Sequence, residues 1–273
     1  MLSLGWRVAT VTLMAVAAQA FVPSVAAMNP TGMSAASPAM RASPQGSNIA
    51  PPSKLKLTYF DIEGVAEKVR LALKVGDIPF EDERVDFASW QSLKPKTPYG
   101  QLPLLTVEEN APVTQSAGML RYVGHLTGLY PEDCMKALKV DEVCGLQEDF
   151  AKALAPSIYI DMRPHLYGYD ENLPTEQRKE IQNKLRSSLM KEGGDVRRFL
   201  GYFEDILKDN GSGFFVGDSV TIADCAMLPQ LRQLKSGRLA GIPVTIVDEY
   251  PHLTNFCNKM MSLPAISQHY GSK

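Results

Sequence analysis

The sequence predicts an α/β domain at 54–132 followed by an all-α domain at 133–273, and three observations support this. Apolar and polar residues alternate over 55–59, and apolar residues then recur at a period near 3.6 up to residue 75, as in a strand followed by a helix. Strand-like stretches return further along the chain, at 84–87, 102–107 and 113–114. Beyond residue 132 only helical periodicity remains. This order predicts one small mixed sheet with helices on its faces, followed by a helical bundle.

The bundle is predicted to contain about five helices. They cover 137–154, ending before Pro156, and then 176–190, 195–208, 222–234 and 252–262. Thr221 and Asp224 stand at the N-cap and the third position of the fourth helix, which is the pattern of a reciprocal capping box. Removing such a cap should cost about 1 kcal/mol. The motif therefore carries folding information and little chemistry.

Composition excludes several classes of protein. The chain has 273 residues, 45% of them hydrophobic, and a net charge of -2, which gives no electrostatic reason to bind nucleic acid or an acidic membrane. Its four cysteines form no C-x-x-C pair, and its four histidines are scattered without the spacing of metal ligands. No cysteine stands near 60–63, where a thiol oxidoreductase of this layout would carry its reactive sulfur.

The first 20 residues have the pattern of a secretory signal peptide. Arg7 precedes an apolar run over 8–18, and Ala18-Gln19-Ala20 is a small-x-small cleavage pattern. A bilayer span needs about 20 apolar residues, so this run is too short for stable membrane insertion, although an uncleaved anchor is the alternative.

Residues 21–53 are predicted to be a disordered transit segment. They are rich in Ala, Ser, Pro, Met and Asn, contain no acidic residue, and cannot bury enough surface to offset the entropy of ordering. Phe21 directly after the predicted cut resembles the two-part presequences of algae with secondary plastids. We expect import into a plastid through the secretory pathway, with simple secretion or residence in the endoplasmic reticulum lumen as the alternative.

Four short motifs stand in order over 57–116. They are Leu57-Thr58-Tyr59-Phe60, Ala66-Glu67-x-x-Arg70, Pro98-x-Gly100-Gln101-Leu102-Pro103 and Gln115-Ser116. In order and spacing they resemble the glutathione-binding half of the glutathione transferases, and above all the tyrosine-using, sigma-type branch that includes glutathione-dependent prostaglandin D synthases. The resemblance implies a thioredoxin-like first domain, an all-helical second domain, glutathione as co-substrate and a homodimer.

Tyr59 is the predicted catalytic residue. It stands at the carboxyl end of the first strand, where open α/β sheets expose their ligands. A phenol there can donate a hydrogen bond to the glutathione thiolate and so lower the pKa of the thiol toward neutral. The alternative is an ordinary aromatic residue of a strand.

The resemblance assigns the remaining glutathione contacts to the first domain. It implies a cis peptide bond before Pro103, with the Leu102 backbone pairing with the cysteinyl part of the tripeptide like an added strand. Ser116, after Gln115 and at the start of a helix over 117–126, would hold the γ-glutamyl carboxylate; a plain N-cap is the alternative.

Trp90 and Lys94 are expected to share one face of a helical turn and to hold the glycine end of the tripeptide, with Gln101 beside them. Trp90 has an alternative role as a packing aromatic. Asp149 would reach across the dimer to the amino group of glutathione, or else be a solvated helix charge. Gly145 replaces an acidic residue that gathers a cation in some relatives, so no metal is predicted.

Val65 is a departure from the family pattern. Sigma-type sequences carry an arginine two residues before the glutamate that is Glu67 here, and that cation would help to polarise the tyrosine and the thiolate. With valine in place of this arginine, Tyr59 would stabilise the thiolate without the help of that cation. We therefore keep a non-catalytic glutathione-binding or structural role as an alternative.

The expected activity is conjugation of glutathione to small hydrophobic electrophiles, with peroxides as further substrates. The electrophile would lie between the 61–65 loop and a group of helix residues, namely Tyr159, Met162, Arg163 and Tyr167. An isomerase that recycles glutathione, as the prostaglandin synthases do, is the alternative within enzymes.

Overall fold

The computed structural model describes residues 50–271. Its sheet has three strands in the order β2-β1-β3, with β1 (Leu55–Phe60) at the centre. Strand β2 (Glu81–Val85) runs parallel to β1, and β3 (Leu104–Val107) runs antiparallel to it. The small mixed sheet predicted from the sequence is therefore present.

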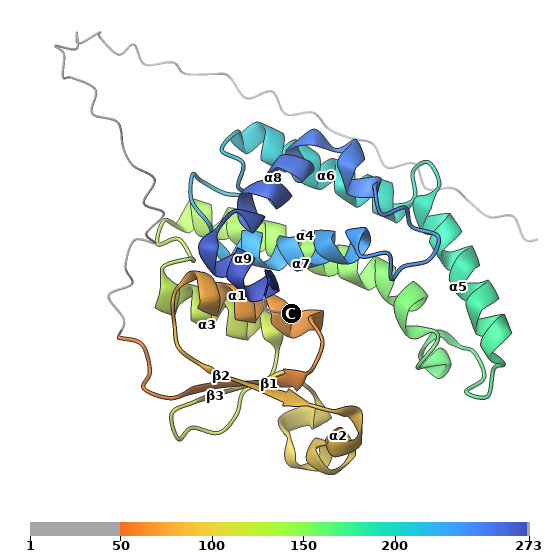
Figure 1. The fold of residues 1–273 in the computed structure, drawn as a ribbon, viewed down its shortest axis with the longest axis horizontal. Helices are drawn as coiled ribbons and strands as arrows, with labels where there is room; N and C mark the ends of the chain where they lie inside the picture. Colours follow the sequence, from red (N-terminus) through yellow and green to blue (C-terminus); the bar gives the residue numbers. More distant parts are fainter. Residues whose placement is uncertain (1–49, 272–273) are drawn as a thin grey trace, which may run out of the picture. The chain divides into compact units, whose positions relative to one another are not determined.

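Three helices accompany the sheet: α1 (Glu67–Val75), α2 (Phe87–Leu93) and α3 (Ser116–Thr127). Figure 1 shows α1 and α3 between the sheet and the later helices. Helix α1 is buried on all sides, because every residue from Glu67 to Leu73 is buried. Short 3-10 turns occur at Gly64–Ala66, Lys94–Lys96, Pro98–Gly100, Pro164–Tyr167 and Ile246–Glu249.

The rest of the described chain is helical. Its helices are α4 (Cys134–Tyr159), α5 (Thr175–Met190), α6 (Asp195–Asn210), α7 (Ile222–Lys235), α8 (Pro251–Met261) and α9 (Pro264–Gly271). An aromatic cluster fills part of its interior: the rings of Phe203 and Phe215 are 6.2 Å apart, and those of Phe215 and Phe256 are 4.9 Å apart. A thioredoxin-like domain followed by a helical domain, the fold class expected from the sequence, is confirmed.

The capping box at the start of α7 is confirmed. The Thr221 backbone N–H and hydroxyl both donate to Asp224 Oδ2, at 2.7 and 2.9 Å, and the Phe215 N–H donates to Asp224 Oδ1 at 2.9 Å. Burial raises the pKa of Asp224 to about 6, although these hydrogen bonds oppose the rise. The Ile222 N–H donates to the Leu129 C=O at 3.0 Å and thereby ties α7 to the chain that follows α3.

Two strand predictions need correction. The second strand ends at Val85 and not at residue 87, because Asp86 caps α2 by accepting a hydrogen bond from the Ser89 N–H at 2.6 Å. The stretch 113–114 forms only an isolated bridge between Val113 and Leu105. The next hydrogen-bonded pair on one side would join Pro103 to Gln115, and Pro103 has no N–H to donate.

One helix prediction was also wrong, and one helix was missed. Helix α4 does not stop before Pro156 but continues to Tyr159, because Gln182 and Arg186 both donate to the Ser157 C=O at 2.9 Å and hold the last turn. Helix α9 was not predicted. Pro264 looks like a stop signal, yet it occupies the start of α9, where its missing N–H costs nothing.

The predicted signal peptide at 1–20 and most of the predicted transit segment at 21–53 lie outside the described residues. Within residues 50–271, no helix combines the length and the apolar character needed to cross a bilayer.

Candidate functional site

Tyr59 lies near the carboxyl end of β1, with only 7% of its surface exposed. Its hydroxyl faces the loop that leads into α1. A Cβ atom added to Gly64 would lie 2.6 Å from that hydroxyl, and the backbone of Val65 lies near enough to lower the pKa of the phenol. The Arg70 guanidinium carbon is 5.7 Å from the centre of the Tyr59 ring. Backbone and cation thus surround the phenol.

Burial raises the pKa of Tyr59 above its usual value of 10.0. The Val65 backbone and the cations Arg70 and Arg163 oppose this rise, whereas Tyr159 adds to it. The phenol therefore stays protonated at neutral pH. In that state it can donate a hydrogen bond to an anion, and it cannot act as a base.

The turn before β3 presents unpaired backbone groups beside Tyr59. The peptide bond between Leu102 and Pro103 is cis, as the sequence resemblance implied. Extending the register of β1 with β3 would set Pro103 opposite Tyr59 and Leu102 opposite Phe60. Among residues 50–271, nothing hydrogen-bonds to the Leu102 N–H or C=O. An extended peptide could add to the chain at this point.

Other predicted residues gather around the same turn. The Gln115 side-chain amide donates to Gln101 Oε1 at 3.1 Å, and a Cβ on Gly100 would lie 3.4 Å from Lys94 Cε. Gln115 has a φ of 76°, a left-handed conformation that is rare for residues other than glycine and is often found at binding sites. A hollow of about 430 Å³ opens beside it, lined by Pro98, Tyr99, Pro112, Val113, Thr114 and Gln115.

Ser116 differs from its predicted place by one residue. It is the first residue of α3 and not the N-cap, which is Gln115. The first bond of the helix runs from the Met119 N–H to the Gln115 C=O, so the N–H groups of the first turn point out of the helix end. A hydroxyl and several N–H groups there suit a carboxylate.

Trp90 and Lys94 lie one helical turn apart, as expected: α2 ends at Leu93, but Lys94 keeps helical φ and ψ and its backbone N–H donates to the Trp90 C=O before a 3-10 turn begins. The Trp90 ring is half-buried and meets Phe60 edge to face, with 5.8 Å between ring centres. Trp90 therefore packs on the residue that follows Tyr59. Lys94 is exposed beside the turn of Gly100.

Asp149 lies apart from this group. Its carboxylate is exposed on α4 and pairs with Lys152 at 3.2 Å. Within the single described chain it contacts none of the other predicted residues, so its role across a dimer stays a prediction.

The predicted electrophile residues come near Tyr59 from the second domain. Tyr159 and Arg163 both act electrostatically on the Tyr59 hydroxyl, and they also act on Tyr167, whose pKa is raised by burial. Met162 is 60% exposed. Phenols and one cation therefore converge on the same region.

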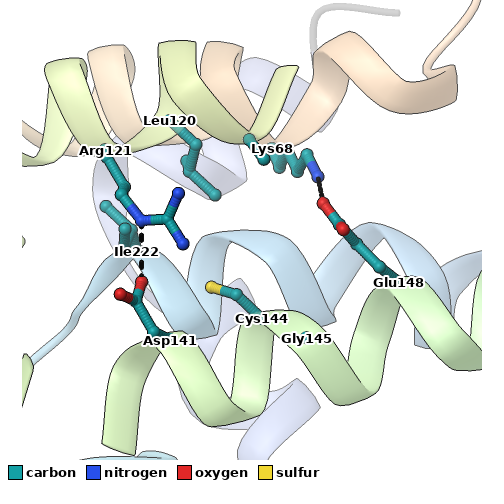
Figure 2. A pocket seen from close by; sticks show the side chains of 9 residues that line it. Lys68, Leu120, Arg121, Asp141, Cys144, Gly145, Glu148 and Ile222 are labelled. Atoms are coloured by element: carbon teal, nitrogen blue, oxygen red, sulfur yellow. Dashed lines mark hydrogen bonds and ion pairs between the residues drawn. The ribbon is translucent and has the colours of Figure 1, made fainter. Parts of the chain in front are cut away.

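A separate cavity of about 70 Å³ lies between α1, α3, α4 and α7 (Figure 2). Two ion pairs flank it, Lys68 with Glu148 at 3.4 Å and Arg121 with Asp141 at 2.9 Å. Burial raises the pKa of its thiol, Cys144, to about 12, so this sulfur is not a nucleophile at neutral pH. None of the predicted site residues lines this cavity. Across residues 50–271, no group of three or more metal-ligating side chains occurs.

The sequence interpretation missed two residues of the site. Gly64 was part of a turn with no assigned role, although only a residue without Cβ fits against the Tyr59 hydroxyl. Arg70 belongs to one of the sequence motifs, but the motif does not predict its contact with the tyrosine ring. Gly64 and Arg70 both stand in the stretch that follows Tyr59 in the sequence, but their contacts with Tyr59 depend on how that stretch folds.

Comparisons with known proteins agree with this geometry. A family model described as the glutathione S-transferase N-terminal domain matches residues 55–125, and one described as the glutathione S-transferase C-terminal domain matches residues 169–273. The chain is 35% identical over 181 residues to glutathione S-transferase 1 of Ascaris suum, covering 66% of this chain and 80% of that protein.

Solved structures give the same result. The glutathione S-transferase from Ascaris lumbricoides is similar with a TM-score of 0.63 and 32% identity, covering 80% of this chain and 97% of that one. Prostaglandin synthase D of Nilaparvata lugens is similar with a TM-score of 0.67 and 26% identity, covering 81% and 98%.

Proposed function

The chain belongs to the glutathione S-transferase family and is a transferase with glutathione as co-substrate, and on this premise we propose that Tyr59 activates the glutathione thiol for attack on small hydrophobic electrophiles. The observation that carries the proposal is the protonated phenol of Tyr59 beside the Leu102 backbone, whose N–H and C=O have no hydrogen-bond partner among residues 50–271. One group can donate to sulfur, and the other can hold the cysteinyl residue that bears it.

Binding of glutathione would use groups at three points. The Leu102 N–H and C=O would pair with the cysteinyl backbone. The Ser116 hydroxyl and the backbone N–H groups of the first turn of α3 would donate hydrogen bonds to the γ-glutamyl carboxylate. Lys94 would pair with the glycine carboxylate, with Trp90 packed behind it and Gln101 beside the tripeptide.

Activation of the thiol follows from the hydrogen bond. A free thiol has a pKa of about 8.5, and a donor that favours the thiolate lowers this value. The proton leaves to solvent, the thiolate sulfur forms a bond to an electrophilic carbon, and the leaving group departs with its electron pair. The Val65 backbone makes the Tyr59 hydroxyl a better donor, because it withdraws electron density from the phenol oxygen.

The second domain would bind the electrophile. Tyr159 is 38% exposed and acts on the Tyr59 hydroxyl, and Arg163 supplies a positive charge to the same region. An isomerase that recycles glutathione is the second candidate, supported by the likeness to prostaglandin synthase D of Nilaparvata lugens.

Two measurements test the proposed function: retention on immobilised glutathione, and turnover of a chromogenic chloronitrobenzene. Tyr59→Phe should lower kcat/KM by about 10- to 100-fold, because a hydrogen bond to a charged group is worth about 1.5–3 kcal/mol. Tyr202→Phe is the matched control, since Tyr202 is 45% exposed on α6 and belongs to none of the predicted site residues. Retention without Tyr59-dependent turnover would indicate a binding protein, and failure of both measurements would refute the proposal.

We further propose a homodimer in which Asp149 reaches the amino group of glutathione on the partner subunit. The support is the family resemblance of the 141–150 segment and the exposure of Asp149. Asp149→Asn should raise KM for glutathione in the dimer and leave kcat unchanged. Sedimentation velocity would show whether a dimer forms, and a monomer with normal KM would contradict the proposal.

Import into a plastid through the secretory pathway is our proposal for localisation. It is supported by the signal-like pattern over 1–20 and the acid-free segment that follows. Mass spectrometry of the mature N-terminus would distinguish cleavage near Ala20 alone, as in secretion, from removal of the whole segment before about Lys54.

A further inference from the structure

The last helix of the chain reaches back to the first. In α9, Nε2 of His269 lies 2.7 Å from Oε1 of Glu67, at the start of α1, although the two residues are 202 positions apart. The Glu67 side chain is fully buried, and that of His269 is 7% exposed. Ile266, also fully buried, anchors the same helix. A carboxylate accepts hydrogen bonds, so the imidazole donates here.

Glu67 also holds Arg70. Its Oε2 atom lies 3.0 Å from Arg70 Nη1, and both side chains are fully buried. The guanidinium then donates to backbone carbonyls of the loop after β1: to Phe60 at 3.4 Å, to Ile62 at 2.9 Å and to Glu63 at 3.2 Å. Since an arginine has a rigid fork of donors, its orientation determines the path of that loop.

The same loop leads from β1 into α1 and lies against Tyr59. It carries Gly64, where an added Cβ would lie 2.6 Å from the Tyr59 hydroxyl, and Val65, whose backbone lowers the pKa of that phenol. A shift of the loop would move the Val65 backbone away from the hydroxyl and weaken the phenol as a donor. The contacts therefore run without a gap from α9, through Glu67 and Arg70, to the group that faces the glutathione sulfur.

A second connection runs on the outside of the loop. Glu63 pairs with Arg232 of α7 at 3.8 Å, and the Arg232 guanidinium carbon is 3.6 Å from the centre of the Tyr270 ring. Burial and the charge of Glu67 raise the pKa of Tyr270, so this phenol stays protonated beside the carboxylate. Two neighbouring residues of α9 thus support one loop from two sides.

We propose that His269 is a positioning residue for thiol activation, acting through Glu67 and Arg70 on the 61–65 loop that contacts the Tyr59 hydroxyl. This inference rests on the proposed role of Tyr59. The imidazole donor fixes one oxygen of Glu67 and Arg70 fixes the other, so the buried carboxylate cannot rotate. Asp82 also accepts a hydrogen bond from Arg70 Nε, at 3.0 Å. Without the imidazole, the guanidinium keeps this partner but loses the fixed position of Glu67, and the path of the loop loosens.

The test compares His269→Ala and His269→Gln in the full chain. The readout is kcat/KM with glutathione and a chloronitrobenzene from about pH 5.5 to about pH 9, whose acid limb reports the pKa of the thiol. His269→Ala should lose about three- to tenfold at the acid end, where a weakened hydrogen bond leaves less thiolate, and little at the alkaline end. His269→Gln keeps an N–H donor and should restore part of the loss.

Ile266→Val is the matched control, because it loosens the packing of α9 and leaves the His269 contact intact. It should lower Tm without shifting the acid limb. An unshifted limb in both His269 variants, with Tyr59-dependent turnover in the wild type, would overturn this inference alone. Turnover of the wild type that does not depend on Tyr59 would overturn both the inference and the proposed function.

Discussion

The hydroxyl of Tyr59 lies so close to Gly64 that a Cβ added to this glycine would be 2.6 Å from the phenol oxygen. The glycine also has a φ of +48°, a conformation that other residues rarely adopt. The position of the phenol is therefore set by the absence of a side chain at one loop residue.

Gly64→Ala should displace the Tyr59 hydroxyl and lower kcat/KM by about 100-fold, since a shift of about 1 Å at a reacting group costs that much. Steady-state kinetics would measure it. Gly193→Ala is the control. Gly193 has a φ of +71°, so alanine there causes a similar backbone strain, but no described atom lies within 4 Å of the added Cβ and no steric clash follows. Equal losses in both variants would contradict the prediction.

Val65→Arg should lower the pKa of the bound glutathione thiol by up to about one unit, because a nearby cation favours the thiolate. Val65 is 45% exposed, so salt should weaken the effect. Spectroscopic titration of thiolate in the glutathione complex is the measurement. Val65→Gln adds length without charge, and a shift of the same size in that variant would show that charge is not the cause.

Ser116→Ala should raise KM for glutathione by about three- to tenfold and leave kcat unchanged, because the hydroxyl is expected to hold a carboxylate far from the reacting sulfur. Steady-state kinetics at varied glutathione would show this. Ser188→Ala, on the exposed surface of α5, should change neither constant. A fall in kcat for Ser116→Ala would point instead to a role in the chemical step.

Asp224→Asn should destabilise the protein by about 1–3 kcal/mol at neutral pH, since an amide cannot accept all three hydrogen bonds and leaves a buried N–H unpaired. The pKa of Asp224 is raised from 3.8 to about 6 in the folded state, so the folded protein holds this proton more tightly than the unfolded chain. The stability from this group is fully present below pH 3.8 and is lost as pH rises through about 6.

Thermal unfolding across this pH window would measure the contribution. The wild type should show the decline with rising pH, and Asp224→Asn should lack that part of it. Parallel curves for the two proteins would mean that Asp224 does not titrate in this range.

Local pattern predicted most of the fold, because β1, α1 and the capping box at Thr221 are determined by residues close together in the chain. The prediction of helix ends failed where contacts between residues distant in the sequence determine the end. The last turn of α4 persists beyond Pro156 because Arg186 of α5 donates to it. The sequence around Pro156 contains no local signal that predicts this contact with Arg186.

The residues of the candidate site likewise fall into those predicted from local motifs and those that depend on distant contacts. Tyr59, Leu102 and Ser116 were found as motif residues, and the structure brings Lys94, Gln101 and Gln115 to one turn. The contact of His269 with Glu67 could not be foreseen, because it joins opposite ends of the described chain and the helix that carries it opens with a residue that usually ends helices.

The packing of Trp90 on Phe60 provides an optical reporter. The chain has two tryptophans, and the other, Trp6, falls in the predicted signal peptide. In a form that lacks those first residues, the intrinsic tryptophan fluorescence would come from one indole, which lies against the residue that follows Tyr59. Titration of glutathione could then be followed by emission alone, without label or electrophile.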